Sequence, residues 1–78
     1  MNEKEIIRAA MKARGISQQE LATKAEGEGS PASFVSEPLR RKNGMRIDKF
    51  AKFIEAMEYE IIVRDPDTKQ EWKLVMEK

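Results

Sequence analysis

The chain has 78 residues, which is enough for one hydrophobic core and too short for two independent domains. Hydrophobic residues make up 40% of it and charged residues 37%, with a net charge of +1, so the composition is that of a folded globular chain. The sequence contains no cysteine and no histidine, which excludes disulfides, cysteine nucleophiles and the usual general base near neutral pH. We therefore expect neither an enzyme nor a metal or cofactor site.

The first two elements are both expected to be helices. Apolar residues recur at helical spacing through the first fourteen residues, with charged residues largely between them, which predicts an amphipathic helix that ends at Arg14. Gly15 can then cap this helix in the left-handed conformation. Ser17 and Glu20 have the spacing of a capping box, which predicts a second helix over residues 17–25.

The third element is expected to be a short helix with an irregular end. Two glycines within residues 26–29 favour a turn. Ser30 and Pro31 have the pattern of an N-cap followed by proline at the first helical position, so we expect the helix to start there. Pro38 predicts that it ends or kinks near Glu37.

The rest of the chain is expected to form one more helix and a hairpin. Residues 43–44 are an Asn-Gly turn signal, after which apolar residues at helical spacing predict a fourth helix over residues 46–57. The apolar period then changes to two in residues 59–64 and again in residues 71–76, which predicts two strands. The sequence Asp-Pro-Asp-Thr at residues 65–68 is typical of the turn between them.

The expected fold is mainly α, with four helices in residues 1–58 and a C-terminal β-hairpin in residues 59–78. A lone hairpin is marginal in water and exposes two edges, so it must pack on the helices or pair with another chain. Apolar residues on both of its faces favour a homodimer whose hairpins form one shared sheet. We expect the dimer interface at Tyr59, Ile61, Ile62, Val63, Trp72, Leu74 and Val75.

The charges segregate along the chain although they nearly cancel overall. Residues 39–52 carry six Lys and Arg against one Asp, whereas residues 26–38 and 53–78 are acidic. A compact basic segment of this kind can dock on a polyanion without making the whole molecule cationic. A solvated basic surface with no partner is the alternative interpretation, and it applies to Lys49 and Lys52 in particular.

Two short helices followed by a basic stretch are the parts of a helix-turn-helix. Residues 15–22, Gly-Ile-Ser-Gln-Gln-Glu-Leu-Ala, resemble the opening of the Cro and phage-repressor type (XRE-like, lambda-repressor-like) of helix-turn-helix domain, and residues 47–57 resemble its fourth helix. Residues 33–36 with Leu39 look like its recognition helix. The resemblance covers residues 5–58, and the hairpin is similar to the C-terminal extension of a subgroup of small bacterial and phage regulators.

The resemblance and the helical pattern together suggest which residues contact DNA. With Val35 facing inward, the outward residues of the third helix are Ala32, Ser33, Ser36 and Glu37, and the resemblance places the first two and Glu37 where the family reads bases. Glu37 can accept a hydrogen bond from a cytosine amine; the alternative is that it merely repels phosphate or pairs with a nearby arginine. Phosphate contacts are expected at Ser17, Gln18, Arg40, Arg41, Lys42, Asn43 and Arg46. For Ser17, helix capping alone is the alternative.

These features predict a sequence-specific transcriptional regulator, a repressor in the simplest case, that binds a palindromic operator in double-stranded DNA as a homodimer. The alternative is a protein-interaction module, such as an antitoxin-like partner of a toxin, in which the hairpin binds a second protein. The longest aliphatic run is residues 61–63, and the first residues do not have the pattern of a signal peptide. We therefore expect a cytoplasmic protein with no membrane partner.

Overall fold

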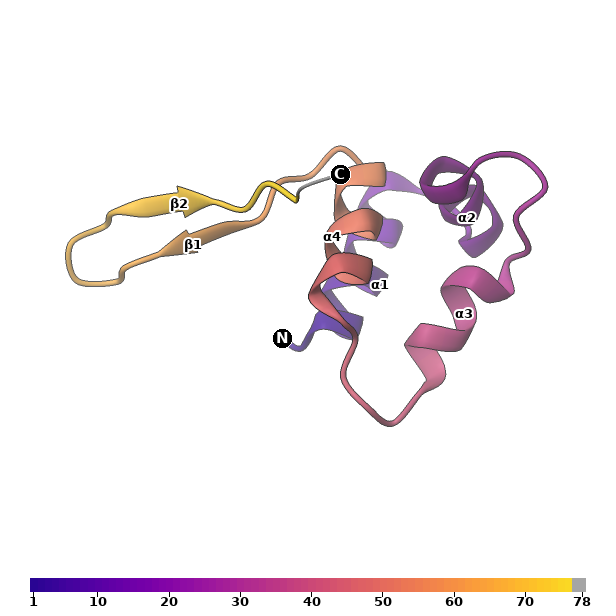
Figure 1. Ribbon diagram of the computed structural model, residues 1–78, viewed down its shortest axis with the longest axis horizontal. Coiled ribbons are helices and arrows are strands. Elements are labelled where there is room, and N and C mark those ends of the chain that lie inside the picture. The colour runs from indigo at the N-terminus through magenta and orange to yellow at the C-terminus, as the bar shows by residue number, and fades with distance from the viewer. Residues whose placement is uncertain (77–78) are drawn as a thin grey trace.

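A computed structural model of the protein describes residues 1–76, which form four helices followed by a short antiparallel hairpin (Figure 1). The elements are α1 (Glu3–Arg14), α2 (Gln18–Glu26), α3 (Ser33–Arg40), α4 (Ile47–Ala56), β1 (Ile62–Arg64) and β2 (Glu71–Lys73). The expectation of a mainly helical chain with a C-terminal hairpin is confirmed. Within the described residues, no helix has the length and apolar character needed to cross a membrane.

The first helix ends, and the second begins, where their capping residues predict. Gly15 follows α1 in the left-handed conformation, with a φ of 66° that costs glycine no steric strain. At the start of α2, the Ser17 hydroxyl accepts the Glu20 N–H at 3.1 Å, and the Glu20 carboxylate accepts the Ser17 N–H at 3.1 Å. The predicted capping box is therefore confirmed.

The third helix begins later than predicted. Ser30 is not its N-cap, because Ala32 occupies that position and makes no side-chain capping bond. The Ser30 carbonyl instead accepts the side-chain amide of Gln19 at 2.7 Å, which ties the connection back to α2. Pro31 belongs to a tight turn ahead of the helix, where its carbonyl accepts the Phe34 N–H at 3.0 Å.

An end of α3 near Glu37, one of the two effects expected of Pro38, is not found. The helix continues through Pro38 to Arg40, and the Arg41 N–H donates to the Glu37 carbonyl at 3.1 Å. Pro38 is the sixth of the eight helical residues, so its missing N–H removes only one bond of the helical ladder. Its ring is buried, and this burial offsets the lost bond.

The hydrophobic core lies between the four helices. In the described chain α2 packs against α3 and α4, and α1 packs against α4. Phe53 is fully buried and meets Phe34 edge to face, with 5.6 Å between the ring centroids. The core cluster comprises Ile7, Met11, Leu21, Ala22, Val35, Leu39, Phe53, Ile54 and Met57.

The hairpin strands are shorter than predicted. The ladder pairs Val63 with Trp72, and beyond it the Leu74 N–H donates to the Ile61 carbonyl at 2.8 Å. Tyr59 and Ile61 pack against the helical core and lie outside the ladder of paired residues. The turn predicted at residues 65–68 is present.

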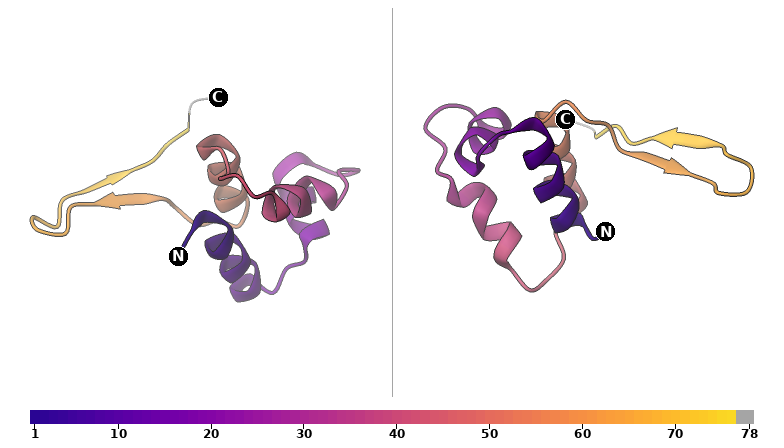
Figure 2. Two further views of the ribbon diagram at one scale, coloured as in Figure 1. Left: turned by 90° about the horizontal axis from the view of Figure 1, so that it is seen from below. Right: turned by 180° about the vertical axis from the view of Figure 1, so that it is seen from behind.

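The hairpin points away from the helices in every view (Figure 1, Figure 2). All residues of both strands are exposed, with Val63 at 60% and Trp72 at 53% of their full accessible surface. Trp72 is therefore not a core residue of its own chain. A lone hairpin can be stabilised by packing on the helices or by pairing with another chain. These two strands do not pack on the helices.

Candidate nucleic-acid interface

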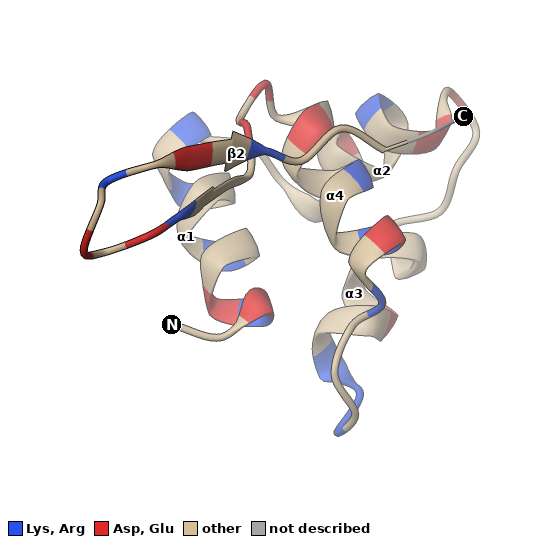
Figure 3. Cartoon of the chain, turned by 60° about the vertical axis from the view of Figure 1, so that its left-hand side comes forward, with Lys and Arg blue, Asp and Glu red and all other residues tan. Residues whose placement is uncertain are grey.

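The basic segment forms one end of the molecule, where α3 ends and the loop to α4 begins (Figure 3). The side chains expected to contact phosphate there are all exposed: Arg40, Arg41, Lys42, Asn43 and Arg46. Arg46 pairs with Asp48 at 3.3 Å, but both side chains are exposed, so the pair is weak and leaves the guanidinium accessible to another anion. This end of the molecule therefore presents a concentrated positive charge.

The outer face of α3 adjoins this basic loop. Val35 is fully buried, as the helical pattern predicts. Ser33 and Glu37 are exposed, whereas Ala32 and Ser36 are half-buried. Glu37 forms no ion pair with the described arginines, so the proposed pairing of this carboxylate is not found.

The N-terminus of α2 is a further exposed position, joined to the segment before α3 by the hydrogen bond from the Gln19 amide to the Ser30 carbonyl. Ser17 and Gln18 are both exposed there. The Ser17 hydroxyl is used as a cap, as described above, so its structural role is shown. The first backbone N–H groups of a helix lack helical partners and carry a partial positive charge, which favours an anion at this position.

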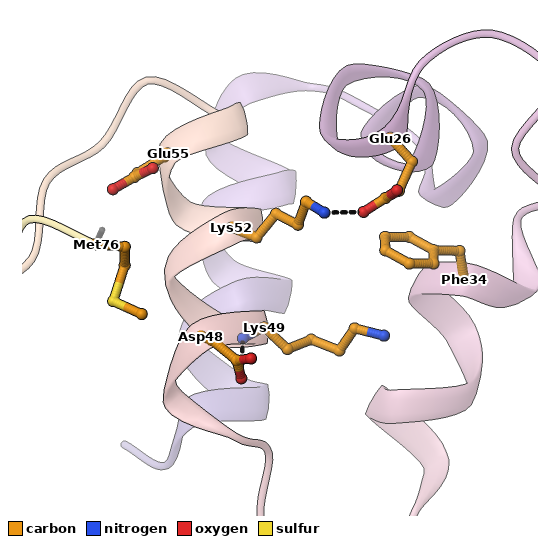
Figure 4. Close-up of a pocket in the computed structure, with 7 residues that line it drawn as sticks. All are labelled: Glu26, Phe34, Asp48, Lys49, Lys52, Glu55 and Met76. Atoms are coloured by element: carbon orange, nitrogen blue, oxygen red, sulfur yellow. Dashed lines mark hydrogen bonds and ion pairs between the residues drawn. The ribbon is translucent and has the colours of Figure 1, made fainter. Parts of the chain in front are cut away.

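Lys49 lies beside the outer face of α3. The sequence allowed it to be only a solvated residue of the fourth helix. Its Nζ lies 4.3 Å from the centre of the Phe34 ring (Figure 4). It also lines a groove of about 320 Å³ together with Ser33, Glu37 and Arg41. Helical periodicity assigns Lys49 to the outside of α4, but no local signal indicates that α3 lies beside it.

Lys52, one turn further along α4, has a different environment. It forms an ion pair with Glu26 at the end of α2, across a hollow of about 520 Å³ between α2, α3 and α4 (Figure 4). Its charge is thereby partly compensated within the molecule. Lys52 is therefore a structural link, and Lys49 is the lysine of α4 that adds to the basic surface.

Side chains of α1 also reach this surface, which no sequence pattern indicated. Arg8 donates to the Leu39 carbonyl at 3.1 Å, and Lys4 donates to the Arg41 carbonyl. The Glu3 carboxylate accepts the Met45 N–H at 3.2 Å. Its own backbone N–H and that of Met45 hold the pKa of Glu3 below its ordinary value.

The expected dimer residues divide into two groups. Tyr59 is half-buried, and the Arg14 guanidinium carbon lies 4.1 Å from the centre of the Tyr59 ring. Tyr59 and Ile61 both pack on the helical core. Leu74 is also half-buried. The accessible apolar residues are Ile62, Val63, Trp72 and Val75. Of these four, Ile62 also lines an apolar groove of about 500 Å³ at the root of the hairpin, between α1 and α4.

No family model, curated protein or solved structure matches this chain. The functional inference therefore depends on the placement of two surfaces, one basic and one apolar. They lie on different parts of the molecule, since the basic loop joins α3 to α4 whereas the hairpin leaves the far end of α4 (Figure 1).

Proposed function

We propose that the protein is a sequence-specific DNA-binding regulator of transcription that represses by occupying its operator. The observation that carries this proposal is the groove shared by Ser33 and Glu37 on the outer face of α3, Arg41 of the basic loop and Lys49 of α4. In this proposal α2 and α3 are a helix-turn-helix of the Cro and phage-repressor type, and α3 enters the major groove.

The basic loop would supply most of the affinity. Arginine and lysine side chains that neutralise phosphates release counterions, so affinity falls steeply with salt. Arg40, Arg41 and Lys42 lie on the loop side of α3, from which they can reach the backbone flanking the groove. The N-terminus of α2, with Gln18, would hold a phosphate on the other side of the groove.

The first turns of α3 would read the bases. The Ser33 hydroxyl can bond to several bases, and the Glu37 carboxylate can accept a hydrogen bond from a cytosine amine. Lys49 stands beside both residues and can reduce the repulsion between Glu37 and nearby phosphates. Sequence preference would therefore depend on few contacts, with the loop fixing the register of the helix.

The hairpin would join two copies of the chain. All the large exposed apolar residues of the described chain except Ile47 lie on the hairpin, on the segment that follows it or along the groove at its root. Exposed apolar patches mark interaction sites, and a two-stranded ribbon needs cover to be stable. A second copy satisfies both requirements, and a two-fold dimer presents two copies of α3 to a palindromic operator.

A protein-interaction module of the antitoxin type is the second candidate. The same exposed hairpin favours it, because an apolar ribbon with two open edges can add a strand to another protein's sheet. DNA binding and this interaction are compatible in one chain. The two candidates differ in whether the basic loop has a ligand.

The deciding experiment reverses the loop charges in an Arg40→Glu, Arg41→Glu double variant. The probe is labelled random-sequence duplex DNA, titrated by fluorescence anisotropy at several salt concentrations. We expect wild-type affinity to fall linearly in log salt, and the double variant to bind at least about tenfold more weakly while remaining folded. A Lys12→Glu, Lys24→Glu variant is the charge-matched control, because both lysines are exposed in the last turns of α1 and α2. Equal weakening in both variants, or no binding by the wild type, would exclude the proposal.

A further inference from the structure

The loop between α3 and α4 is not held by its own backbone. Residues 42–45 form no backbone–backbone hydrogen bond with any described residue. Most of the loop is exposed, and only Met45 is half-buried against the core. A loop with these properties is free to open unless side chains hold it. This same loop carries the side chains that the proposed function assigns to phosphate.

The first two turns of α1 supply the missing contacts. Arg8 donates to the Leu39 carbonyl at 3.1 Å, inside the last turn of α3, and Lys4 donates to the Arg41 carbonyl just beyond it. The Glu3 carboxylate accepts the Met45 N–H at 3.2 Å, near the other end of the loop. The contacts therefore begin in the last turn of α3 and reach nearly to the other end of the loop, and all of them come from one helix.

The chemistry of these contacts suits the groups that they satisfy. The last carbonyls of a helix have no helical donor and carry a partial negative charge, so cationic side chains stabilise them. The Met45 N–H lies in an irregular segment, and a carboxylate is the strongest acceptor available to it. Each contact replaces a bond that regular secondary structure would otherwise make.

We propose that Glu3, Lys4 and Arg8 are positioning residues that hold the α3–α4 loop in the conformation that presents its cations to phosphate. The inference rests on the proposed function and extends it to a helix that is not part of the DNA surface. A loop that is ordered before binding does not lose its conformational freedom on binding, so affinity is gained without an added phosphate contact.

Glu3 gives the sharpest test, because its charge and its hydrogen bond predict opposite effects. Removing a carboxylate beside a basic loop makes the molecule more positive, so charge alone predicts tighter DNA binding. Loss of the loop contact predicts weaker binding. A Glu3→Ala variant therefore distinguishes a positioning role from a purely electrostatic one by the direction of the change.

Three variants with the same charge make up the experiment. Glu3→Ala removes the acceptor, Glu3→Gln keeps an amide oxygen that can accept the Met45 N–H, and Glu5→Ala removes a nearby exposed carboxylate whose side chain does not contact the loop. Each is titrated against the random-sequence duplex pool at several salt concentrations. We expect Glu3→Ala to bind about three- to tenfold more weakly than the other two, which corresponds to the loss of one hydrogen bond.

The salt dependence of DNA binding is a second readout, and a change in the stability of the fold alone would not alter it. If the loop is loosened, fewer phosphates are neutralised at once, so the plot of log affinity against log salt becomes shallower for Glu3→Ala. If Glu3→Ala does not fold, Arg8→Met and Arg8→Gln form a second charge-matched pair, in which only glutamine retains a donor for the Leu39 carbonyl.

The outcomes separate the two proposals. If the wild type binds the duplex pool and Glu3→Ala matches Glu3→Gln in affinity and in salt dependence, the positioning role is overturned and the DNA-binding function stands. If the wild type binds no duplex at low salt, the proposed function fails at the first titration and the positioning role fails with it. Weaker binding by Glu3→Ala, with rescue by Glu3→Gln, supports both.

Discussion

At the scale of single residues, Ser17 combines a demonstrated structural role with a proposed functional one. Its hydroxyl caps α2 by accepting the Glu20 N–H, and the same residue stands at the helix end that would hold a phosphate. The two roles can be separated by substitution, because one variant can remove the capping oxygen and another can keep it while adding a negative charge.

We expect Ser17→Ala to lower the free energy of unfolding by about 1 kcal/mol, because alanine cannot satisfy the N–H that the cap accepts. Ser17→Asp keeps a capping oxygen, so its stability should stay close to that of the wild type, but its negative charge should repel phosphate and weaken DNA binding. Urea denaturation measures the first effect and anisotropy the second. Wild-type affinity of the Asp variant would show that Ser17 is a cap only.

The contacts that sequence patterns did not predict all join residues far apart in the chain. Glu3 and Met45 are 42 positions apart, and Arg8 and Leu39 are 31 apart. Capping boxes and glycine caps are readable because their partners lie within a few residues. The contacts of α1 with the loop, and of Lys49 with Phe34, depend on how helices pack, and helical periodicity shows only which face of a helix is buried.

At the scale of elements, the third helix shows where local rules fail. Pro38 is a helix breaker by propensity, yet α3 continues for two residues past it, with the proline itself buried. The hairpin strands were predicted too long for a related reason, since Tyr59 and Ile61 alternate like strand residues but pack on the helices. In both cases tertiary packing overrides the local conformational preference that the sequence pattern indicates.

The hairpin turn should depend on pH through Asp65. Its carboxylate accepts the N–H groups of Asp67 at 2.9 Å and Thr68 at 3.3 Å, and these bonds, in that order of importance, lower the pKa of Asp65 below its ordinary value of 3.8. A lowered pKa means that the ionised form stabilises the folded turn. The stabilisation is complete above the ordinary value and is lost as the pH falls through the lower folded value.

An NMR titration of the amide resonances of Asp67 and Thr68 tests this dependence. We expect both to shift together at acid pH, with a midpoint below 3.8. Asp65→Asn is the control, because the amide can still accept hydrogen bonds but does not titrate. A midpoint at or above the ordinary value would contradict the role of Asp65 in the turn.

At the scale of the whole molecule, every residue of the two hairpin strands is exposed in the part of the chain that the structure describes. The sequence predicted that a hairpin exists and that both of its faces are partly apolar. It did not predict that both strands stand clear of the helices, because alternation does not specify which surface covers an apolar face. The proposed dimer supplies that cover.

Ile62→Glu tests the dimer without removing the hairpin. Ile62 is 44% exposed and directly opposite Lys73 in the ladder, so a glutamate there can form a cross-strand ion pair within one chain. A charge buried between two copies would be costly, so we expect the dimer to weaken at least about tenfold. Light scattering over a dilution series measures the mass.

Ile47→Glu is the matched control, because Ile47 is 58% exposed at the start of α4, away from the hairpin. We expect this variant to keep the mass of the wild type. A wild type with the mass of one chain, or equal masses for both variants over the whole series, would argue against assembly through the hairpin.

The position of Trp72 gives the protein an intrinsic optical reporter. It is the single tryptophan of the chain, and it lies on an exposed strand opposite Val63. Its indole is therefore largely in water when the chain is alone, and a partner that covers the hairpin must shift its emission to shorter wavelength. Assembly can then be followed at nanomolar to micromolar concentrations without any label, in the presence or absence of DNA.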